Sequence, residues 1–347
     1  MFLILVLQLV GGIMKVVNIH GKRYDTLTFQ WLEAYLHCFK AFRELGYTVH
    51  VDPQIVFKGG RPDFIELGLN DSEEAINFYN HTYLSEVKRN NLPRGSKTLF
   101  IKPTAPAPNY FTIDELGYAC NSKITYEKPN FEGTKTKFFF NNTVRDLISK
   151  REHKWSQTNE VSFCTAQNVP EDHILVIAQM PGDETVTKFS FGNHWIKLQQ
   201  IIDTLKDSNT VVLKLHPTFK SVTMKSGHWE NFRNIILRWI SEGVTVYEDE
   251  ESLYDILPKT NIAIIENSTA GIECLMHEIP IISYGYPEYH WVTKDMRHLS
   301  MLQSYIDDTS WWDPDRSKEW LAWYCTKYQC HNYASTFNRL EELCSEI

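Results

Sequence analysis

The chain has 347 residues, of which 43% are hydrophobic and 22% charged, and it carries a formal net charge of −8. This composition is typical of a globular protein with room for two domains, and the negative charge without a long basic run argues against nucleic acid as the main partner. The seven cysteines contain no C-x-x-C pair, which argues against a zinc site and a disulfide framework and favours a reducing, cytoplasmic setting.

Residues 1–13 form an apolar N-terminal extension that is too short to span a bilayer, which takes about 20 residues. They lack a basic leader and a clear cleavage site for a signal peptide. We expect a dispensable segment ahead of the first domain. The alternative is a weak anchor, which would allow at most peripheral association with a membrane surface.

Residues 14–160 are predicted to form a first, Rossmann-like α/β domain that binds the acceptor. Its opening β–α–β pattern is typical of nucleotide- or sugar-binding halves, although no G-x-G-x-x-G loop is present. The predicted elements are strands at residues 15–19, 47–51 and 98–101 and helices at residues 29–45 and 71–90. The first turn holds a polar cluster that either solvates a loop or faces an interdomain cleft: His20, Lys22, Arg23 and Asp25.

Asp114 and Glu115 lie between apolar residues in the segment 110–118, after a proline-rich run. A carboxylate in an apolar, partly closed loop has a raised proton affinity and can act as a general base. Because adjacent side chains rarely face the same way, we expect at most one of them to be the base. In the alternative interpretation, Asp114 caps a turn and Glu115 is solvated.

Residues 161–300 alternate strictly between strands and helices, which predicts a parallel, doubly wound sheet. Ligands of such sheets bind beyond the carboxyl ends of the strands, so three loops should converge there: residues 179–183, 214–217 and 266–269. The predicted strands are 173–179, 210–215, 244–247, 262–265 and 281–283, and the predicted helices are 193–206, 229–241, 252–257 and 269–277.

Two of these loops carry groups that suit an anion. His216 can donate to a phosphate oxygen, and Lys214 adds charge if it points to the same cleft. Asn267, Ser268 and Thr269 begin a helix, whose N-terminus carries partial positive charge. A lone histidine at a strand end is usually structural, and the tripeptide could simply cap the helix. The expected meeting of both features at one sheet edge favours a phosphate site.

Residues 301–347 form an aromatic-rich tail with two predicted helices, at residues 317–328 and 333–345. The tail either contacts both domains or caps the second domain. Asp313 and Asp315 match the Asp-x-Asp pattern of metal-dependent sugar transferases, but their position in the tail favours a turn.

Segments 179–183, 212–217, 267–273 and 280–285, and more loosely 112–118, resemble the capsular-polysaccharide biosynthesis glycosyltransferases of the Kdo-transferase type. The resemblance implies a GT-B fold, with two Rossmann-like doubly wound domains and C-terminal helices packed across them. It also implies that a first-domain acid is the base. The site residues that it implies on the donor side are His216, Ser268 and Thr269 at the phosphate, Glu273 near the nucleoside, and Gln179 and Asp183 in the neighbouring loop.

One spacing departs from that family. Sugar transferases often have two glutamates separated by seven residues at this helix, whereas Glu266 and Glu273 are separated by six. From the residues alone, Glu273 either accepts hydrogen bonds from ribose hydroxyls or compensates the helix dipole.

We therefore expect a glycosyltransferase of hexosyl or Kdo type that acts in polysaccharide or surface-glycan synthesis, with a nucleotide sugar and a glycan acceptor as its partners. No metal or other cofactor is expected, because a helix N-terminus and a histidine take the place of a cation. The alternatives are a nucleotide-sugar epimerase of the same build and a non-catalytic sugar- or nucleotide-binding protein.

Overall fold

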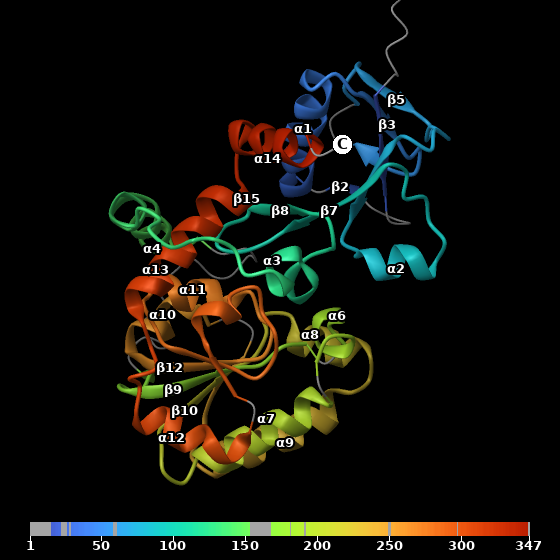
Figure 1. Cartoon of the computed structure of the whole chain (residues 1–347). Helices are drawn as coiled ribbons and strands as arrows, with labels where there is room; N and C mark the ends of the chain where they lie inside the picture. Colours follow the sequence, from blue (N-terminus) through green and yellow to red (C-terminus); the bar gives the residue numbers. More distant parts are fainter. Residues whose placement is uncertain are drawn as a thin grey trace, which may run out of the picture.

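The computed structural model shows two α/β domains, one above the other in Figure 1. The N-terminal extension, three residues of the polar turn (Lys22, Arg23 and Asp25) and residues 153–167 lie outside the described residues. The structure describes residues 15–21, 26–27, 29–57, 61–152, 168–180, 182–190, 192–248, 251–296 and 298–345.

The first domain is built on a seven-stranded sheet with the order β15-β8-β7-β6-β1-β3-β5. Its strands β5, β3, β1, β6 and β7 are parallel. At one edge, β8 pairs antiparallel with β7, and β15 pairs antiparallel with β8. The elements of this domain are β1 (Val16–His20), β2 (Thr26–Leu27), α1 (Phe29–Glu44), β3 (Thr48–Val51), β4 (Val56–Phe57), β5 (Ile65–Leu67), β6 (Ile76–Asn80), α2 (Leu84–Arg89), β7 (Lys97–Pro103), β8 (Phe111–Asp114), η1 (Ala119–Asn121), α3 (Lys123–Tyr126), η2 (Phe139–Val144) and α4 (Arg145–Lys150).

The helix predicted over residues 71–90 is wrong for its first half, because β6 is a fully buried strand between β1 and β7. Two polar residues of this strand interrupt the apolar run by which a buried strand is predicted. One of them, Asn77, accepts a hydrogen bond at 2.7 Å from Nε2 of His20, whose ring stacks on Tyr79 at 4.1 Å. His20 is thus packed into the first domain and does not line the interdomain cavity.

The second domain has a fully parallel sheet with the order β11-β10-β9-β12-β13-β14. Counted along the chain, this order is 3-2-1-4-5-6, that of a Rossmann fold, so the predicted doubly wound sheet is confirmed. The elements are β9 (His173–Ile177), α6 (Glu184–Thr187), α7 (His194–Leu205), β10 (Val211–Lys214), α8 (Phe219–Lys225), α9 (Trp229–Ser241), β11 (Thr245–Tyr247), α10 (Leu253–Ile256), η3 (Leu257–Lys259), β12 (Thr260–Ile265), α11 (Ala270–Met276), β13 (Ile281–Ser283), η4 (His290–Val292) and β14 (Lys294–Asp295).

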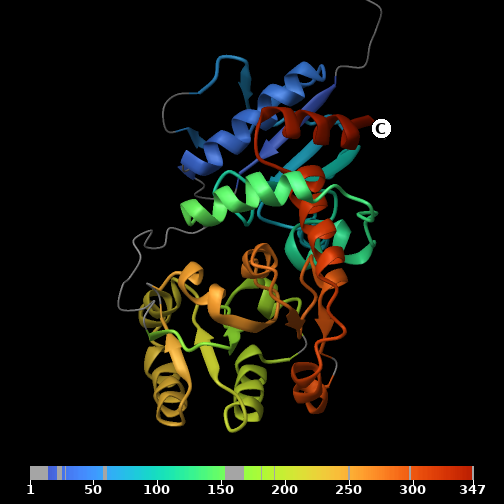
Figure 2. The same cartoon turned by 90° about the vertical axis from the view of Figure 1, so that its left-hand side faces the viewer.

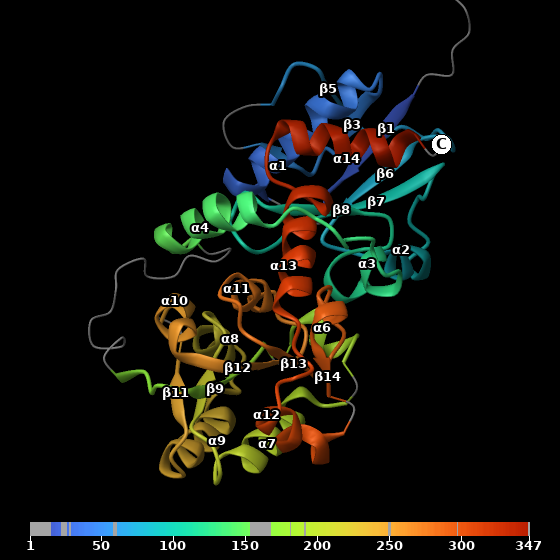
Figure 3. The same cartoon turned by 60° about the vertical axis from the view of Figure 1, so that its left-hand side comes forward.

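The C-terminal tail returns from the second domain to the first, as Figures 2 and 3 show. Helix α13 contacts α11, β15 pairs antiparallel with β8, and α14 packs on α1 in the core of the first domain. The prediction that C-terminal helices pack across both domains is therefore confirmed. The tail consists of η5 (Leu299–Met301), α12 (Leu302–Asp307), α13 (Pro314–Trp323), the π-helical turn η6 (Tyr324–Tyr328), β15 (Gln329–Cys330) and α14 (Tyr333–Ser345).

The Asp-x-Asp match in the tail is a helix cap. The side chain of Asp313 accepts a hydrogen bond at 3.0 Å from the backbone N–H of Arg316 at the start of α13. In the part of the chain that the structure describes, no cluster of three or more histidine, cysteine or acidic side chains could hold a metal ion. None of the helices in that part has the length and apolar character needed to cross a membrane.

Candidate functional site

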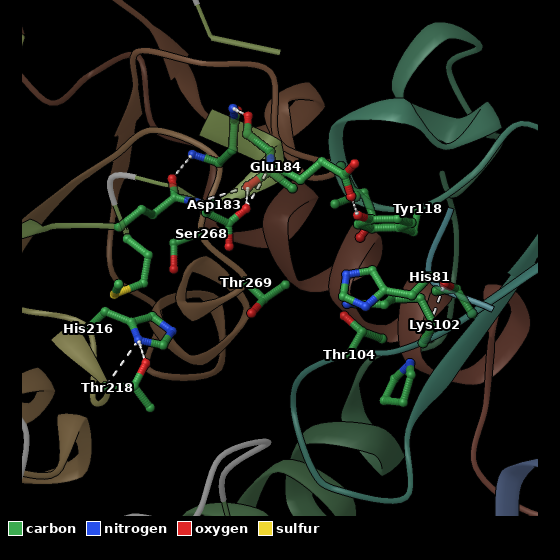
Figure 4. A pocket seen from close by; sticks show the side chains of 18 residues that line it. His81, Lys102, Thr104, Tyr118, Asp183, Glu184, His216, Thr218, Ser268 and Thr269 are labelled. Carbon is green, nitrogen blue, oxygen red and sulfur yellow. Dashed lines mark hydrogen bonds between the residues drawn. The ribbon is translucent and has the colours of Figure 1, made fainter. Parts of the chain in front are cut away.

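A cavity of about 420 Å³ lies between the two domains, beyond the carboxyl ends of strands from both sheets. On the second-domain side it lies over β9 and β12, which are neighbours in the sheet although they are distant in sequence. This is the crossover point at which doubly wound sheets bind their ligands. Figure 4 shows the side chains of both walls pointing toward the space between them.

Six of the predicted donor-binding residues line this cavity: Gln179, Asp183, His216, Asn267, Ser268 and Thr269. They converge because β9, β10 and β12 end at Ile177, Lys214 and Ile265, so that the loop after each strand opens toward the first domain.

His216 has a defined tautomer. Its Nδ1 accepts a hydrogen bond at 3.2 Å from the backbone N–H of Thr218 and lies 3.0 Å from the Thr218 hydroxyl. Because a backbone N–H can only donate, Nδ1 is the acceptor nitrogen, and in a neutral ring the proton resides on Nε2. The ring points toward Thr269 and the opposite wall in Figure 4. The cavity therefore receives an oriented N–H donor.

The turn at residues 267–269 is held closely against its surroundings. The backbone carbonyl of Ser268 accepts a hydrogen bond at 2.5 Å from the hydroxyl of Tyr289, and α11 begins two residues later. A Cβ at Gly271 would lie 2.1 Å from the ring of Tyr289, so only glycine allows α11 to pack this closely. The first N–H groups of α11 are bonded within the turn, so the groups that it can direct at an anion are the hydroxyls of Ser268 and Thr269.

Gln179 and Asn267 fasten the neighbouring loop. The side-chain oxygen Oε1 of Gln179 accepts from the backbone N–H of Asn267 at 2.7 Å. The side-chain amide of Gln179 donates to the hydroxyl of Thr185 at 3.2 Å, and that of Asn267 donates to the Thr185 backbone carbonyl at 3.0 Å. Asp183 caps α6, since its Oδ1 accepts from the N–H and the hydroxyl of Thr185 at 2.8 Å and 2.6 Å. Together these bonds set the position of the Asp183 carboxylate on the cavity wall.

Two predicted donor-binding residues lie elsewhere. Lys214 is buried, and its ammonium donates to the backbone carbonyls of Leu215 (2.9 Å) and Glu248. It therefore supplies hydrogen bonds to carbonyls at the end of the sheet and does not line the cavity. Glu273 is buried within α11 and likewise does not line it.

Glu266, just before the turn, is fully buried and pairs with His194 and with Lys197, the latter at 3.2 Å. Burial alone would raise the pKa of Glu266, but these partners hold it below its ordinary value. Glu266 does not line the cavity, so it stabilises the strand end rather than contacting a ligand there.

Asp114, one of the two predicted bases, is also outside the cavity. It is fully buried and accepts the backbone N–H groups of Leu116 (2.7 Å), Gly117 (3.1 Å) and Lys123 (3.0 Å) and the hydroxyl of Tyr328 (2.7 Å). Burial raises the pKa of Asp114, and these hydrogen bonds offset part of that rise. With its oxygens occupied in this way, Asp114 acts as a structural anchor.

Glu115, the other predicted base, pairs with Lys97 at 2.8 Å and with Lys123 at 3.0 Å and does not line the cavity. Burial alone would raise the pKa of Glu115, but the two ammonium groups outweigh it and lower the pKa. We therefore retain neither first-domain carboxylate as the base.

The first-domain wall consists of residues that the sequence interpretation missed. His81 follows β6 with a left-handed φ of 49°, and its Nε2 accepts from the ammonium of Lys102, which also lies 4.9 Å from the centre of the Tyr118 ring. These side chains face the second domain in Figure 4. Lys102 directly follows the predicted strand at residues 98–101, so the carboxyl-end rule would have found it, whereas His81 follows β6, which was not predicted as a strand.

Glu184 and Glu288 complete the cavity from the second domain, and neither was predicted. Glu184, the first residue of α6, accepts the hydroxyls of Tyr118 at 2.7 Å and Tyr83 at 3.3 Å and pairs with Lys188. It therefore joins the two domains beside the cavity. The positions of both glutamates on the cavity wall depend on contacts between segments that are distant in the chain, and no sequence pattern indicates those contacts.

Two facing Rossmann-like domains, a ligand cavity between them and a tail that returns to the first domain define a protein of the GT-B class. A family model described as "Capsule polysaccharide biosynthesis protein" matches residues 120–303, and the chain belongs to this family. This match confirms the resemblance to the capsular-polysaccharide biosynthesis proteins that the sequence motifs indicated.

Several solved structures are similar to this chain at low identity. The KpsC β-Kdo 2,7 transferase of Thermosulfurimonas dismutans has 12% identity over 94% of this chain and 99% of that chain, with a TM-score of 0.49. The KpsC β-Kdo 2,4 transferase of the same organism has 14% identity over 93% and 98%, with a TM-score of 0.47. Anabaena Alr3699/HepE in complex with UDP has 9% identity over 96% and 100%, with a TM-score of 0.41. No curated protein sequence matches the chain.

Proposed function

We propose that the protein is a glycosyltransferase that moves a sugar from a nucleotide-activated donor to a glycan acceptor inside the interdomain cavity. The observation that carries this proposal is the position of His216. Its Nε2–H, held in place by Thr218, shares one cavity wall with Ser268 and Thr269. Membership of a capsule polysaccharide biosynthesis family supports the same conclusion.

In this scheme the donor phosphate lies between His216 and the turn at residues 267–269. As the bond from the anomeric carbon to the phosphate oxygen breaks, its electron pair leaves with the nucleotide. Donors aimed at the oxygen that gains charge lower the barrier of such a step. These N–H and O–H groups take the role that a metal ion has in other sugar transferases, so the proposed reaction needs no metal.

Asp183 is the carboxylate that we assign to the reacting sugar. The anomeric carbon becomes positively charged in the transition state of glycosyl transfer, and a fixed carboxylate stabilises that charge. Thr185 binds Oδ1 of Asp183 at 2.6 Å and 2.8 Å, which holds the group on the cavity wall without using its second oxygen. The acceptor hydroxyl forms the new bond and gives its proton to a carboxylate of the cavity.

The first-domain wall bears on the class of sugar. Lys102 is a cation in this wall, and it favours a donor or acceptor that carries a carboxylate, as Kdo does, over a neutral hexose. Replacing Lys102 by Met should therefore impair transfer of an acidic sugar by more than tenfold, since a hydrogen bond to a charged group contributes about 1.5–3 kcal/mol. For a neutral sugar the same substitution should change the rate little.

A thermal-shift screen against CMP, UDP, GDP and CDP tests the donor site and identifies the nucleotide, because a ligand of the folded state raises the melting temperature. Transfer is then measured with sugars of the matching nucleotide. A glycosyltransferase should lose transfer in the Asp183→Asn variant while it keeps donor affinity. An epimerase would convert the donor without an acceptor, and a binding protein would show neither reaction.

A further inference from the structure

Glu288 is a buried carboxylate on the cavity wall that the donor site does not explain. Only 5% of its surface is exposed, and it lies in the segment that follows β13. Three residues further on, the indole N–H of Trp291 donates to the backbone carbonyl of Ile124 in the first domain at 2.7 Å. The segment with Glu288 therefore lies at the junction with the domain that is expected to bind the acceptor.

The C-terminal tail supplies a partner for this carboxylate. The hydroxyl of Tyr324, the first residue of the π-helical turn η6, donates to Oε2 of Glu288 at 2.5 Å. Tyr324 is fully buried, and its ring stacks on Trp320 at 4.7 Å and on Tyr328 at 5.6 Å. The phenol is thus fixed by packing, and it fixes the carboxylate in turn. Short π-helical turns are rare and occur frequently at functional sites.

We propose that Glu288 is the general base of the reaction and that Tyr324 is the residue that positions it, so that the C-terminal tail completes the active site. This inference rests on the proposed glycosyl transfer. The acceptor hydroxyl gives its proton to the Glu288 carboxylate while its oxygen bonds to the anomeric carbon. The bond between that carbon and the donor phosphate breaks, and its electron pair leaves with the nucleotide.

The other carboxylates of the cavity are less suited to this role. Glu184 already accepts two phenol hydroxyls and pairs with Lys188. Asp183 belongs to the loop beside the donor turn, and Oδ1 is committed to the cap of α6. Glu288 combines burial, a single fixed orientation and a place at the acceptor side.

The ionisable groups that face Glu288 from the elements packed around it are one thiol and three phenols. Burial raises the pKa of the Cys120 thiol and of the phenols of Tyr289, Tyr324 and Tyr328, so all four are neutral there. The remaining ionisable side chains of the cavity walls are His81, Lys102, Tyr118, Asp183, Glu184 and His216. These are unchanged in the variants below, so differences between the variants report on Glu288.

The test measures transfer as a function of pH for the full chain and for three variants, with donor affinity determined in parallel. Glu288→Gln should lower kcat by roughly 100- to 10,000-fold, the usual contribution of a general base, while donor affinity stays within about twofold. Tyr324→Phe removes the hydrogen bond to the charged carboxylate, which raises its proton affinity. The acidic limb of the kcat/KM profile should move up by about one pH unit, and the rate at low pH should fall about tenfold.

Tyr328→Phe is the matched control, because it removes a phenol of the same turn that bonds to Asp114 instead. It should lower the melting temperature and leave the pH profile in place. If Glu288→Gln does not fold, Glu288→Asp, which withdraws the carboxylate by one methylene, should lower kcat with unchanged donor affinity.

Full transfer activity of Glu288→Gln or Glu288→Asp would overturn the inference while leaving the proposed function intact. An acidic limb at the same pH in Tyr324→Phe and Tyr328→Phe would also overturn it, since it would show that the phenol of Tyr324 merely stabilises the tail. If the unmodified protein transfers no sugar from any nucleotide donor that it binds, the proposed function fails and the inference fails with it.

Discussion

Replacing His216 by Ala tests the phosphate site at the group on which it most depends. The imidazole is already oriented in the free protein, because Thr218 holds Nδ1 with its backbone N–H at 3.2 Å and its hydroxyl at 3.0 Å. Little ordering entropy is therefore lost when Nε2–H meets a phosphate oxygen. The substitution removes this donor and leaves the turn at residues 267–269 unchanged.

The expected loss follows from the kind of hydrogen bond. A hydrogen bond to a charged group contributes about 1.5–3 kcal/mol, and each 1.4 kcal/mol is tenfold in Kd, so His216→Ala should raise the nucleotide Kd by about 10- to 150-fold. Thr218→Val keeps the backbone N–H bond to Nδ1 and removes only the hydroxyl. It should raise Kd by roughly 2- to 12-fold, as expected for a neutral hydrogen bond of about 0.5–1.5 kcal/mol.

Isothermal titration calorimetry with the nucleotide identified by thermal shift measures these changes. His228→Ala is the control, since His228 is exposed at the start of α9, belongs to the same domain and does not line the cavity. Its Kd should equal that of the unmodified protein. An unchanged Kd in His216→Ala, or equal losses in the two histidine variants, would refute the assignment of the phosphate to this ring.

Three further substitutions separate structural carboxylates from functional ones. Asp114→Asn places an amide where four donors converge, which should cost roughly 1–3 kcal/mol of folding free energy. Because each kcal/mol lowers the melting temperature by about 2–4 °C, calorimetry should show a melting temperature that is lower by several degrees, with donor affinity unchanged. The pKa of Glu115 is depressed in the folded state, so its stabilising contribution is present above its unfolded pKa of about 4.3 and is lost as the pH falls through the folded value. Glu115→Gln should therefore show a smaller fall in melting temperature between about pH 5 and pH 3, and a fall equal to that of the unmodified protein would contradict this account. Glu184→Ala removes the acceptor of two first-domain phenols, so small-angle scattering should show a larger radius of gyration, and an unchanged radius would show that this contact does not hold the domains together.

The second domain was largely predictable from sequence because its signals are local. Helix α9 spans Trp229–Ser241 and strand β13 spans Ile281–Ser283, the same bounds that periodicity predicts. Buried parallel strands appear as continuous apolar runs, and the helices between them repeat every 3.6 residues. The first domain offered weaker signals. Strand β6 contains Asn77, whose side chain is satisfied by a residue 57 positions earlier in the chain.

The candidate site was predictable to the same extent. His216 and Ser268 lie in the loops two and three residues after the ends of β10 and β12, and they reach the cavity because these loops open at the carboxyl edge of the sheet. Lys214 is the last residue of β10, and its ammonium instead reaches the carbonyl of Glu248 on the neighbouring loop. No sequence pattern around Lys214 indicates that acceptor, which lies 34 residues away.

Apolar surroundings alone do not identify a catalytic acid, as Asp114 shows. Asp114 has those surroundings, but it uses them to bind Tyr328, which is 214 residues away. Four residues earlier on the same π-helical turn, Tyr324 binds Glu288. The tail thus holds one buried carboxylate of each domain with two stacked phenols, 5.6 Å apart. Neither contact could be predicted from local sequence patterns, because each joins a carboxylate to a phenol in a distant part of the chain.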